Sequence, residues 1–324
     1  MSDSTRWAFP PESQPTQDEV AFDLKAAQNA VVALRAEVPD DAFTAAILGT
    51  ERFGNGVVIR DDGLILTVGY LITEATSVWL TANDGSVVEG HALAYDFATG
   101  LGLVLPLGRL GQPAIPRGSI ASVAVDDDVI VIGHGGRTHS LKATVFAKRE
   151  FVGYWEYLLE EALFTTPPHP EWSGAALLDE DGRLIGIGSL LLEEAMGEET
   201  VDGNMFVPVE LLDPILEGLL NTGRSSAPPR PWLGMYAAEA EGRLVVKGLA
   251  SGGPAERAGV QSGDMVVALG GERVASLGEL LRKAWRMGPA GTEIPLTLAR
   301  RGAPVHVRIQ SADRHDFMRK PSLQ

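Results

Sequence analysis

Short β-type runs that follow one another with almost no helix between them constrain this chain most strongly. They are rich in Val, Ile, Leu and Thr and fill the region from residue 30 to residue 209. Asp-Gly and Gly-Gly pairs, which favour tight turns, separate several of them. A series of this kind predicts an all-β sandwich or a pair of barrels. The predicted strands are 30–38, 56–59, 64–68, 77–81, 87–95, 102–105, 128–133, 141–147, 163–165, 175–178, 184–189 and 205–209.

The sequence on either side of this region indicates the domain organisation. Residues 18–30 have the spacing of a short amphipathic helix, and residues 209–221 that of a helix kinked by Pro214. The segment 222–231, TGRSSAPPRP, combines small polar residues with three prolines and predicts a semi-rigid linker. The expected division is a mobile N-terminal arm over 1–17, a first domain over 18–221, the linker over 222–231, a second domain over 232–311 and a tail over 312–324.

Composition excludes several classes of protein. The 324 residues carry a formal net charge of −16, which disfavours a nucleic-acid binder or a binder of anionic membranes. The chain has no cysteine, which excludes disulfide frameworks, thiol nucleophiles and CxxC redox chemistry. Neither a secretory leader nor an apolar run long enough for membrane insertion is visible, so a cytoplasmic location is expected. No cofactor is expected.

The region after the linker carries a long ordered motif. Residues 253–264 read GPAERAGVQSGD, and an apolar strand, the Gly270-Gly271 pair and a helix after Ser276 follow. This series resembles a PDZ domain of the bacterial HtrA type. The resemblance implies that Trp232-Leu233-Gly234-Met235 forms a loop whose backbone N–H groups bind the C-terminal carboxylate of a peptide, beside a groove face at Leu281. The alternative is a blocked groove, with the domain serving only as a clamp.

Motifs in the β-rich region resemble those of the HtrA/Do-like, trypsin-fold serine proteases over about residues 30–221. Residues 54–59 (GNGVVI) and 62–67 (DGLILT) match that family's GSGxII and DGxILT hairpin. Residues 173–187 match its SGGPLxxxxGxVIGI strand pair, and residues 205–208 (MFVP) match its FAIP strand. The resemblance implies a mainly β fold, in which a trypsin-like double β-barrel is followed by a PDZ domain.

The catalytic residues of that family are mostly absent from the matching positions. Ser173 stands at the nucleophile position, but Tyr70 stands in place of the family's His and Gly100 in place of its Asp. Glu171 replaces the glycine whose N–H lines the oxyanion hole, and Trp172 adds bulk beside the serine. A tyrosine hydroxyl, with an ordinary pKa near 10, is a poor base at pH 7. We therefore expect Ser173 to be a relic without triad proteolysis.

Other polar residues of the region supply no obvious replacement. His169, in Pro-Pro-His-Pro, is expected to be a fixed loop residue rather than a base, and Asp96 to belong to a turn. His134 and His139 are five residues apart, a spacing typical of neither a helical pair nor a zinc site. The acidic run 126–128 predicts a solvated turn. No metal site is expected.

These features favour a pseudoprotease that binds peptides, or unfolded or C-terminal protein segments, without cutting them. Binding is expected through the PDZ groove and the vacated protease cleft, in a chaperone-like or regulatory role. Two alternatives stay open: an atypical serine endopeptidase that uses Ser173, and a structural or regulatory subunit that assembles with an active HtrA-type protease. The resemblance also implies a homo-oligomer, a trimer formed through roughly Trp7–Leu24. Within the same arm, Trp7 and Phe9 could act as anchors, but a loosely packed terminus is the favoured interpretation.

Overall fold

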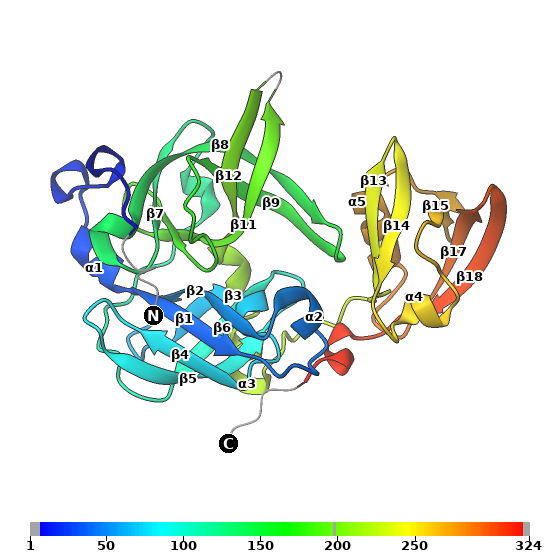
Figure 1. Ribbon diagram of the computed structural model, residues 1–324, viewed down its shortest axis with the longest axis horizontal. Coiled ribbons are helices and arrows are strands. Elements are labelled where there is room, and N and C mark those ends of the chain that lie inside the picture. Colours follow the sequence, from blue (N-terminus) through cyan, green and yellow to red (C-terminus); the bar gives the residue numbers. More distant parts are fainter. Residues whose placement is uncertain (1–6, 197–198, 320–324) are drawn as a thin grey trace. The chain divides into compact units, whose positions relative to one another are not determined.

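The computed structural model describes residues 7–196 and 199–319, which form two compact units (Figure 1). The second unit consists of Ala227–Met318 together with Glu150–Glu160, and the first of the remaining described residues. The sequence-based boundaries place 150–160 in the first domain and 312–318 in a tail, whereas both segments pack in the second unit. The reason is apolar burial, because Leu158 is 4% exposed within the second unit's core.

The first barrel closes in the strand order β1-β2-β3-β6-β5-β4. At its β2–β3 turn Gly63 has a φ of 88°, a left-handed backbone that glycine adopts without steric penalty. The Asp62 carboxylate accepts a hydrogen bond from the Leu64 amide at 3.3 Å, so the predicted Asp-Gly signal does close this turn. The strands are β1 (Val31–Glu37), β2 (Glu51–Val58), β3 (Ile65–Val68), β4 (Ser77–Thr81), β5 (Val87–Tyr95) and β6 (Leu101–Pro106).

The second barrel closes in the order β10-β11-β12-β9-β8-β7. Leu163, Leu177 and Phe206 are fully buried in its core. Strands β11 and β12 pair beyond the barrel as a protruding hairpin (Figure 1). The strands are β7 (Asp128–Ile132), β8 (Ser140–Gly153), β9 (Tyr157–Thr166), β10 (Ala176–Leu178), β11 (Leu184–Met196) and β12 (Glu199–Pro208).

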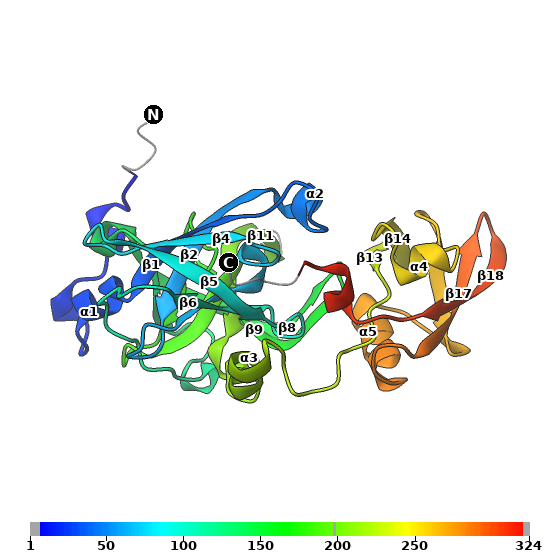
Figure 2. The same cartoon turned by 90° about the horizontal axis from the view of Figure 1, so that it is seen from below.

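The second unit contains a sheet in the order β13-β14-β15-β17-β18, with β16 paired to β15. Strand β13 is therefore an edge strand, and β17 and β18 form the long hairpin that Figure 2 shows. The helix α5 (Leu277–Arg286) begins where the Ser276 side chain accepts from the Glu279 amide, and it buries Leu280 and Leu281. The other elements are β13 (Met235–Ala240), β14 (Arg243–Leu249), α4 (Pro254–Arg257), β15 (Met265–Leu269), β16 (Glu272–Arg273), β17 (Glu293–Arg300) and β18 (Ala303–Gln310).

The two helices predicted in the first domain are shorter than expected. The helix α1 covers only Leu24–Asn29, because Gln17 accepts from the Leu24 amide and Asp23 caps the first turn. The helix predicted over 209–221 is interrupted at Pro214 instead of kinked, since a 3₁₀ turn ends at Leu212 and α3 spans Leu216–Thr222. Within residues 7–196 and 199–319, no helix is both long and apolar enough to cross a membrane.

Candidate functional site

The side chains of Ser173 and Tyr70 lie in direct contact. Ser173 precedes β10, and Tyr70 lies in a 3₁₀ turn, Gly69–Leu71, directly after β3. The two hydroxyl groups share a short hydrogen bond, and the Tyr70 hydroxyl also bonds to the Ser189 carbonyl at 2.8 Å. A carbonyl only accepts, so the single Tyr70 proton goes to Ser189 and the Ser173 hydroxyl donates to Tyr70.

Burial makes Tyr70 a still weaker base. Desolvation raises the pKa of Tyr70 to about 12, although hydrogen bonds from the side chains of Ser173 and Trp172 act in the opposite direction. At neutral pH the phenol is therefore protonated, and its proton is already donated. The Ser173 hydroxyl has no proton acceptor in Tyr70 of the kind that an imidazole provides.

The turn that carries Tyr70 is fixed by a buried arginine. Arg52, 4% exposed, donates from Nη1 to the carbonyls of Tyr70 at 2.7 Å and Thr73 at 2.8 Å. Its Nη2 donates to the Thr44 hydroxyl at 2.7 Å. Glu74, 2% exposed, accepts from the amide and the hydroxyl of Thr44, so the charge of Arg52 has a buried counterpart. Tyr70 is thus held by a network that would resist rearrangement of the cleft.

The position expected for the triad acid carries only backbone. Gly100 has a φ of 77°, and its carbonyl accepts from the Gly69 amide at 2.7 Å. The nearby Asp96 carboxylate accepts from the Thr99 amide at 2.7 Å, and the Asp96 carbonyl accepts from the Gly100 amide. Asp96 therefore closes a turn, as predicted, and Gly100 connects that turn to Tyr70's segment.

The amide at the predicted oxyanion position is already in use. The Glu171 N–H donates to His169 Nδ1 at 3.1 Å, and His169 Nε2 bonds to the His139 carbonyl at 3.0 Å. These contacts require the neutral tautomer with a proton on Nε2. Burial lowers the pKa of His169 to about 4, which keeps that tautomer at neutral pH. His169 is thus a buried structural residue, and it removes a donor from any oxyanion hole.

Asn55 and Trp172 complete the segment around Ser173. Asn55 donates from Nδ2 to the Glu171 carbonyl at 2.8 Å, and its amide donates to the Ser173 carbonyl at 2.7 Å. Trp172 is half-buried, and its carbonyl accepts from the Ala175 amide at 3.0 Å. The loop that carries the serine is therefore tied down on both sides by backbone contacts.

The N-terminal arm packs on this segment from Trp7 onward, although the sequence predicts a mobile arm over residues 1–17. The Trp7 indole donates to the Glu171 carboxylate at 3.1 Å, and its ring packs edge-on against His139 and His169. The Phe9 ring does the same on His169 at 5.0 Å between centroids. Trp7 and Phe9 therefore anchor the described part of the arm, because their rings pack edge-on against the imidazoles of His139 and His169.

The remaining predicted groups behave as structural residues. The His134 amide donates to Asn55, and burial lowers the pKa of the His134 side chain. In the acidic run, Asp127 accepts from the Ala124 amide at 2.8 Å and so caps a turn. Among the described residues no group of three or more His, Asp or Glu side chains could hold a metal ion.

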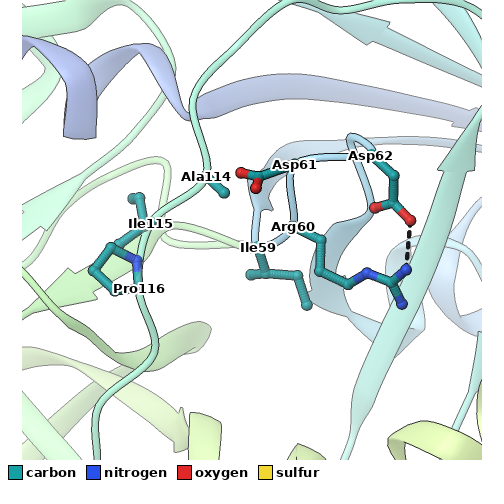
Figure 3. Close-up of a pocket in the computed structure, with 7 residues that line it drawn as sticks. All are labelled: Ile59, Arg60, Asp61, Asp62, Ala114, Ile115 and Pro116. Atoms are coloured by element: carbon teal, nitrogen blue, oxygen red, sulfur yellow. Dashed lines mark hydrogen bonds and ion pairs between the residues drawn. The ribbon is translucent and has the colours of Figure 1, made fainter.

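A separate pocket of about 580 Å³ lies beside the β2–β3 turn (Figure 3). Its polar contents are the Arg60–Asp62 ion pair, 2.5 Å long with both side chains about half exposed, and Asp61. Water screens such a pair strongly. None of the predicted site residues lines it, and we assign it no chemical role. Its lining is Ile59, Arg60, Asp61, Asp62, Ala114, Ile115 and Pro116.

In the second unit the predicted carboxylate loop holds a carboxylate, and it comes from a glutamate side chain of the same chain. Glu156, in the β8–β9 turn, accepts from the amides of Leu233 and Met235, each at 2.9 Å. Gly234 between them has a φ of 68°. Sequence reasoning missed Glu156, because an acidic residue in a turn carries no signal of what it binds.

Two other groove predictions need correction. The Trp232 amide donates to the Ala312 carbonyl at 3.0 Å and the Trp232 ring packs on Phe317, so Trp232 anchors the chain end instead of offering a free donor. Leu281 is 1% exposed within the same apolar core as Leu158, so it presents little surface to a ligand.

Comparison with known families agrees with the two folds. Residues 54–187 match the trypsin-like peptidase domain model, and residues 231–310 match the PDZ domain model. The fold and the site thus define a trypsin-like peptidase domain followed by a PDZ domain. The chain is homologous to the DegS and DegP-like serine endoproteases.

Individual relatives are identical to this chain at about a quarter of the aligned positions. Serine endoprotease DegS of Haemophilus influenzae is 24% identical over 275 residues, covering 81% of this chain and 77% of that protein. DegS of Escherichia coli K12 is 27% identical over 272 residues, covering 78% and 74%. A probable periplasmic serine endoprotease, DegP-like, of Halomonas elongata is 25% identical over 273 residues, covering 80% of this chain and 56% of that protein. The chain thus spans about half of the DegP-like relative, and its cytoplasmic location stays a prediction.

Solved structures show the same fold at lower identity. The HtrA-type protease AlgW with tripeptide has a TM-score of 0.52 at 19% identity, covering 93% of this chain and 99% of that one. The serine endoprotease from Yersinia pestis has a TM-score of 0.52 at 23% identity, covering 91% and 99%. The mainly β fold predicted from the sequence is confirmed.

Proposed function

We propose that this HtrA-type chain binds peptides or protein C-termini without cleaving them. One observation carries the catalytic half of the proposal. The Ser173 hydroxyl donates to Tyr70, whose pKa is about 12 and whose own proton is donated to Ser189. A serine nucleophile needs a neighbour that takes its proton during attack, and this neighbour does not.

Magnitudes support the absence of proteolysis. Loss of one triad member in a serine protease costs on the order of 10⁴–10⁶ in kcat. Here Tyr70 and Gly100 replace two members. The Glu171 amide is also bonded to His169, which removes a further interaction worth about 10²–10³ in kcat.

The test is incubation of the full chain with unfolded casein and, separately, with a fluorophosphonate probe. We expect neither turnover nor labelling above the level of a Ser173→Ala variant. Labelling or casein cleavage that Ser173→Ala abolishes would instead support the atypical endopeptidase that the sequence left open. Assembly with an active relative stays a prediction.

The binding half of the proposal is supported by the loop at Leu233–Met235. Its two amides already accommodate a carboxylate, and Met235 begins the edge strand β13, to which an extended peptide can add as a further strand. Such main-chain recognition requires a free C-terminal carboxylate and one apolar side chain. The corresponding test compares free-acid with amidated peptides, because amidation removes the charge that strengthens the hydrogen bonds.

A further inference from the structure

The β8–β9 turn presents its glutamate to the loop through an uncommon backbone conformation. Glu156 has a φ of 61°, a left-handed value that is rare for residues other than glycine, asparagine and aspartate. Its Oε2 accepts from the Leu233 amide and its Oε1 from the Met235 amide. Each carboxylate oxygen thus has its own main-chain donor. This is the pairing that a peptide's terminal carboxylate makes in such a loop.

The rest of the turn region contacts helix α5 and the edge strand β13. On α5, Arg282 pairs with Glu150 of one hairpin strand and with Glu160 of the other, the latter at 2.5 Å. Gly278 leaves room on the same helix, since a Cβ there would meet Glu150 Oε1 at 3.2 Å. On β13, Tyr236 packs edge-on against Tyr154.

Apolar contact and a backbone hydrogen bond strengthen this arrangement. Leu158 is buried within the core of the second unit, and Val152 packs partly buried against that core. Arg314 donates from Nη1 to the Trp155 carbonyl at 3.3 Å. The segment from Glu150 to Glu160 therefore contacts the carboxylate loop, the helix and the edge strand together.

From this geometry we infer that Glu156 is an internal ligand of the carboxylate loop, so that a free protein C-terminus binds only by displacing it. The inference rests on the proposed function of the loop and names its regulation. The occupant is the side-chain carboxylate, and the competitor is a main-chain carboxylate of a partner with an apolar last residue. The two share the same N–H donors and cannot bind at once.

The first measurement is titration of the full chain with fluorescein-labelled heptapeptides that end in Val, Leu or Phe with a free carboxylate. We expect Glu156→Ala to bind at least about tenfold more tightly than the wild type, the factor that corresponds to one lost charge-assisted hydrogen bond. Glu156→Gln, which keeps the shape but replaces one of the two acceptor oxygens with an NH2 group, is expected in between. Glu161→Gln is the matched control, because Glu161 lies on the same hairpin and its carboxylate is half exposed beside Lys148. Equal affinity of the wild type and Glu156→Ala overturns the inference.

The second measurement does not depend on any peptide. Hydrogen–deuterium exchange of the amides in residues 232–236 is compared between the wild type, Glu156→Ala and Glu161→Gln. We expect faster exchange in Glu156→Ala alone, because its loop amides lose their acceptor. Unchanged exchange overturns the inference. If no peptide binds to any variant while exchange accelerates in Glu156→Ala, the proposed recognition of C-termini fails and the internal ligand stands.

Discussion

The cleft at Ser173 and the loop at Leu233–Met235 depend on different parts of the chain for their chemistry. Catalysis by a triad needs particular side chains, and on the proposed function Tyr70 and Gly100 leave the cleft without the base and its acid partner. Carboxylate binding in the loop needs backbone amides, which every residue except proline supplies. A main-chain site can therefore survive sequence divergence that a catalytic triad does not.

The two sites also differ in what occupies them. The Tyr70 hydroxyl contacts Ser173 but is itself protonated at neutral pH, so it cannot act as the base for the serine. Glu156 meets the loop with the functional group that a ligand would bring. On the proposed function, the first contact opposes triad catalysis, whereas the second places a carboxylate where the C-terminus of a peptide would bind.

The largest expected effect concerns catalysis at Ser173. We expect Tyr70→His with Gly100→Asp to stay at least about 10⁴-fold below an active DegS in casein cleavage. One structural reason applies: the Glu171 amide remains bonded to His169. Activity of the double variant within about a hundredfold of DegS would show that the oxyanion segment rearranges freely.

A smaller effect is expected for peptide binding at the loop Leu233–Met235. In the Glu156→Ala background, Gly234→Val should weaken binding of free-acid peptides by about tenfold to a hundredfold. A β-branched side chain is strained at the φ of 68°, and a Cβ there would lie 3.2 Å from the Ala250 Cβ. Gly242→Val is the matched control, since Gly242 has a φ of 69° but its Cβ would meet nothing within 4 Å. Equal weakening by both variants would mean that strain alone, and not the loop, governs binding.

The third prediction concerns how firmly the cleft is locked. His169→Ala should reduce the free energy of unfolding by about 2–4 kcal/mol in urea titration, because the Glu171 amide and the His139 carbonyl lose their partner. The pKa of His169 is lowered to about 4, so its contribution is present above the ordinary value near 6.5 and is lost as the pH falls toward 4. This part of the acid sensitivity should vanish in the variant. A half-buried histidine on β5 serves as the control, and His91→Ala should change stability by less than about 1 kcal/mol.

The smallest effect is a pH dependence of peptide binding. Burial raises the pKa of Glu156 to about 7, although the amides of Leu233 and Met235 and the charge of Arg314 act in the opposite direction. The docked side chain therefore takes up a proton near neutrality, and its docking weakens as the pH rises. The pKa of a peptide's terminal carboxylate is about 3.5, so that group stays ionised.

Wild-type affinity for a free-acid peptide should accordingly increase about tenfold between pH 6 and pH 8. The charged groups that face Glu156 include Arg314, and the phenols of Tyr154 and Tyr236 lie on either side of the hairpin contact. Burial raises the pKa of the Tyr236 phenol above its ordinary value near 10, so this group stays protonated in the interval. Glu156→Gln should show a flat profile, and a parallel rise in that variant would assign the effect to another group.

Much of the fold could be predicted from the sequence, because turn pairs and apolar alternation are local signals. The order of the motifs placed Tyr70 and Ser173 at the family's His and nucleophile positions, but it did not predict their direct contact. Local signals did not reveal that the helix expected over residues 18–30 begins only at Leu24, where the Asp23 cap and the Gln17 side chain set its start.

The missing parts of the sites are contacts between residues distant in sequence. The Glu171–His169 bond depends on a loop conformation, and the Glu156 contact depends on a positive φ and a partner almost eighty residues away. Neither a composition nor a spacing reports such contacts.

Because Glu156 belongs to the same chain as the loop, a free peptide always competes with it for the loop amides. A tethered group is present at a constant effective concentration, on the order of millimolar for short connections, however dilute the protein is. If the loop is occupied about 99% of the time, a peptide with an intrinsic Kd near 1 μM binds with an apparent Kd near 100 μM. A dilute C-terminus then rarely displaces Glu156, whereas C-termini at a local concentration above this apparent Kd do displace it. Glu156 would thus turn a binding site into a detector of local crowding among C-termini.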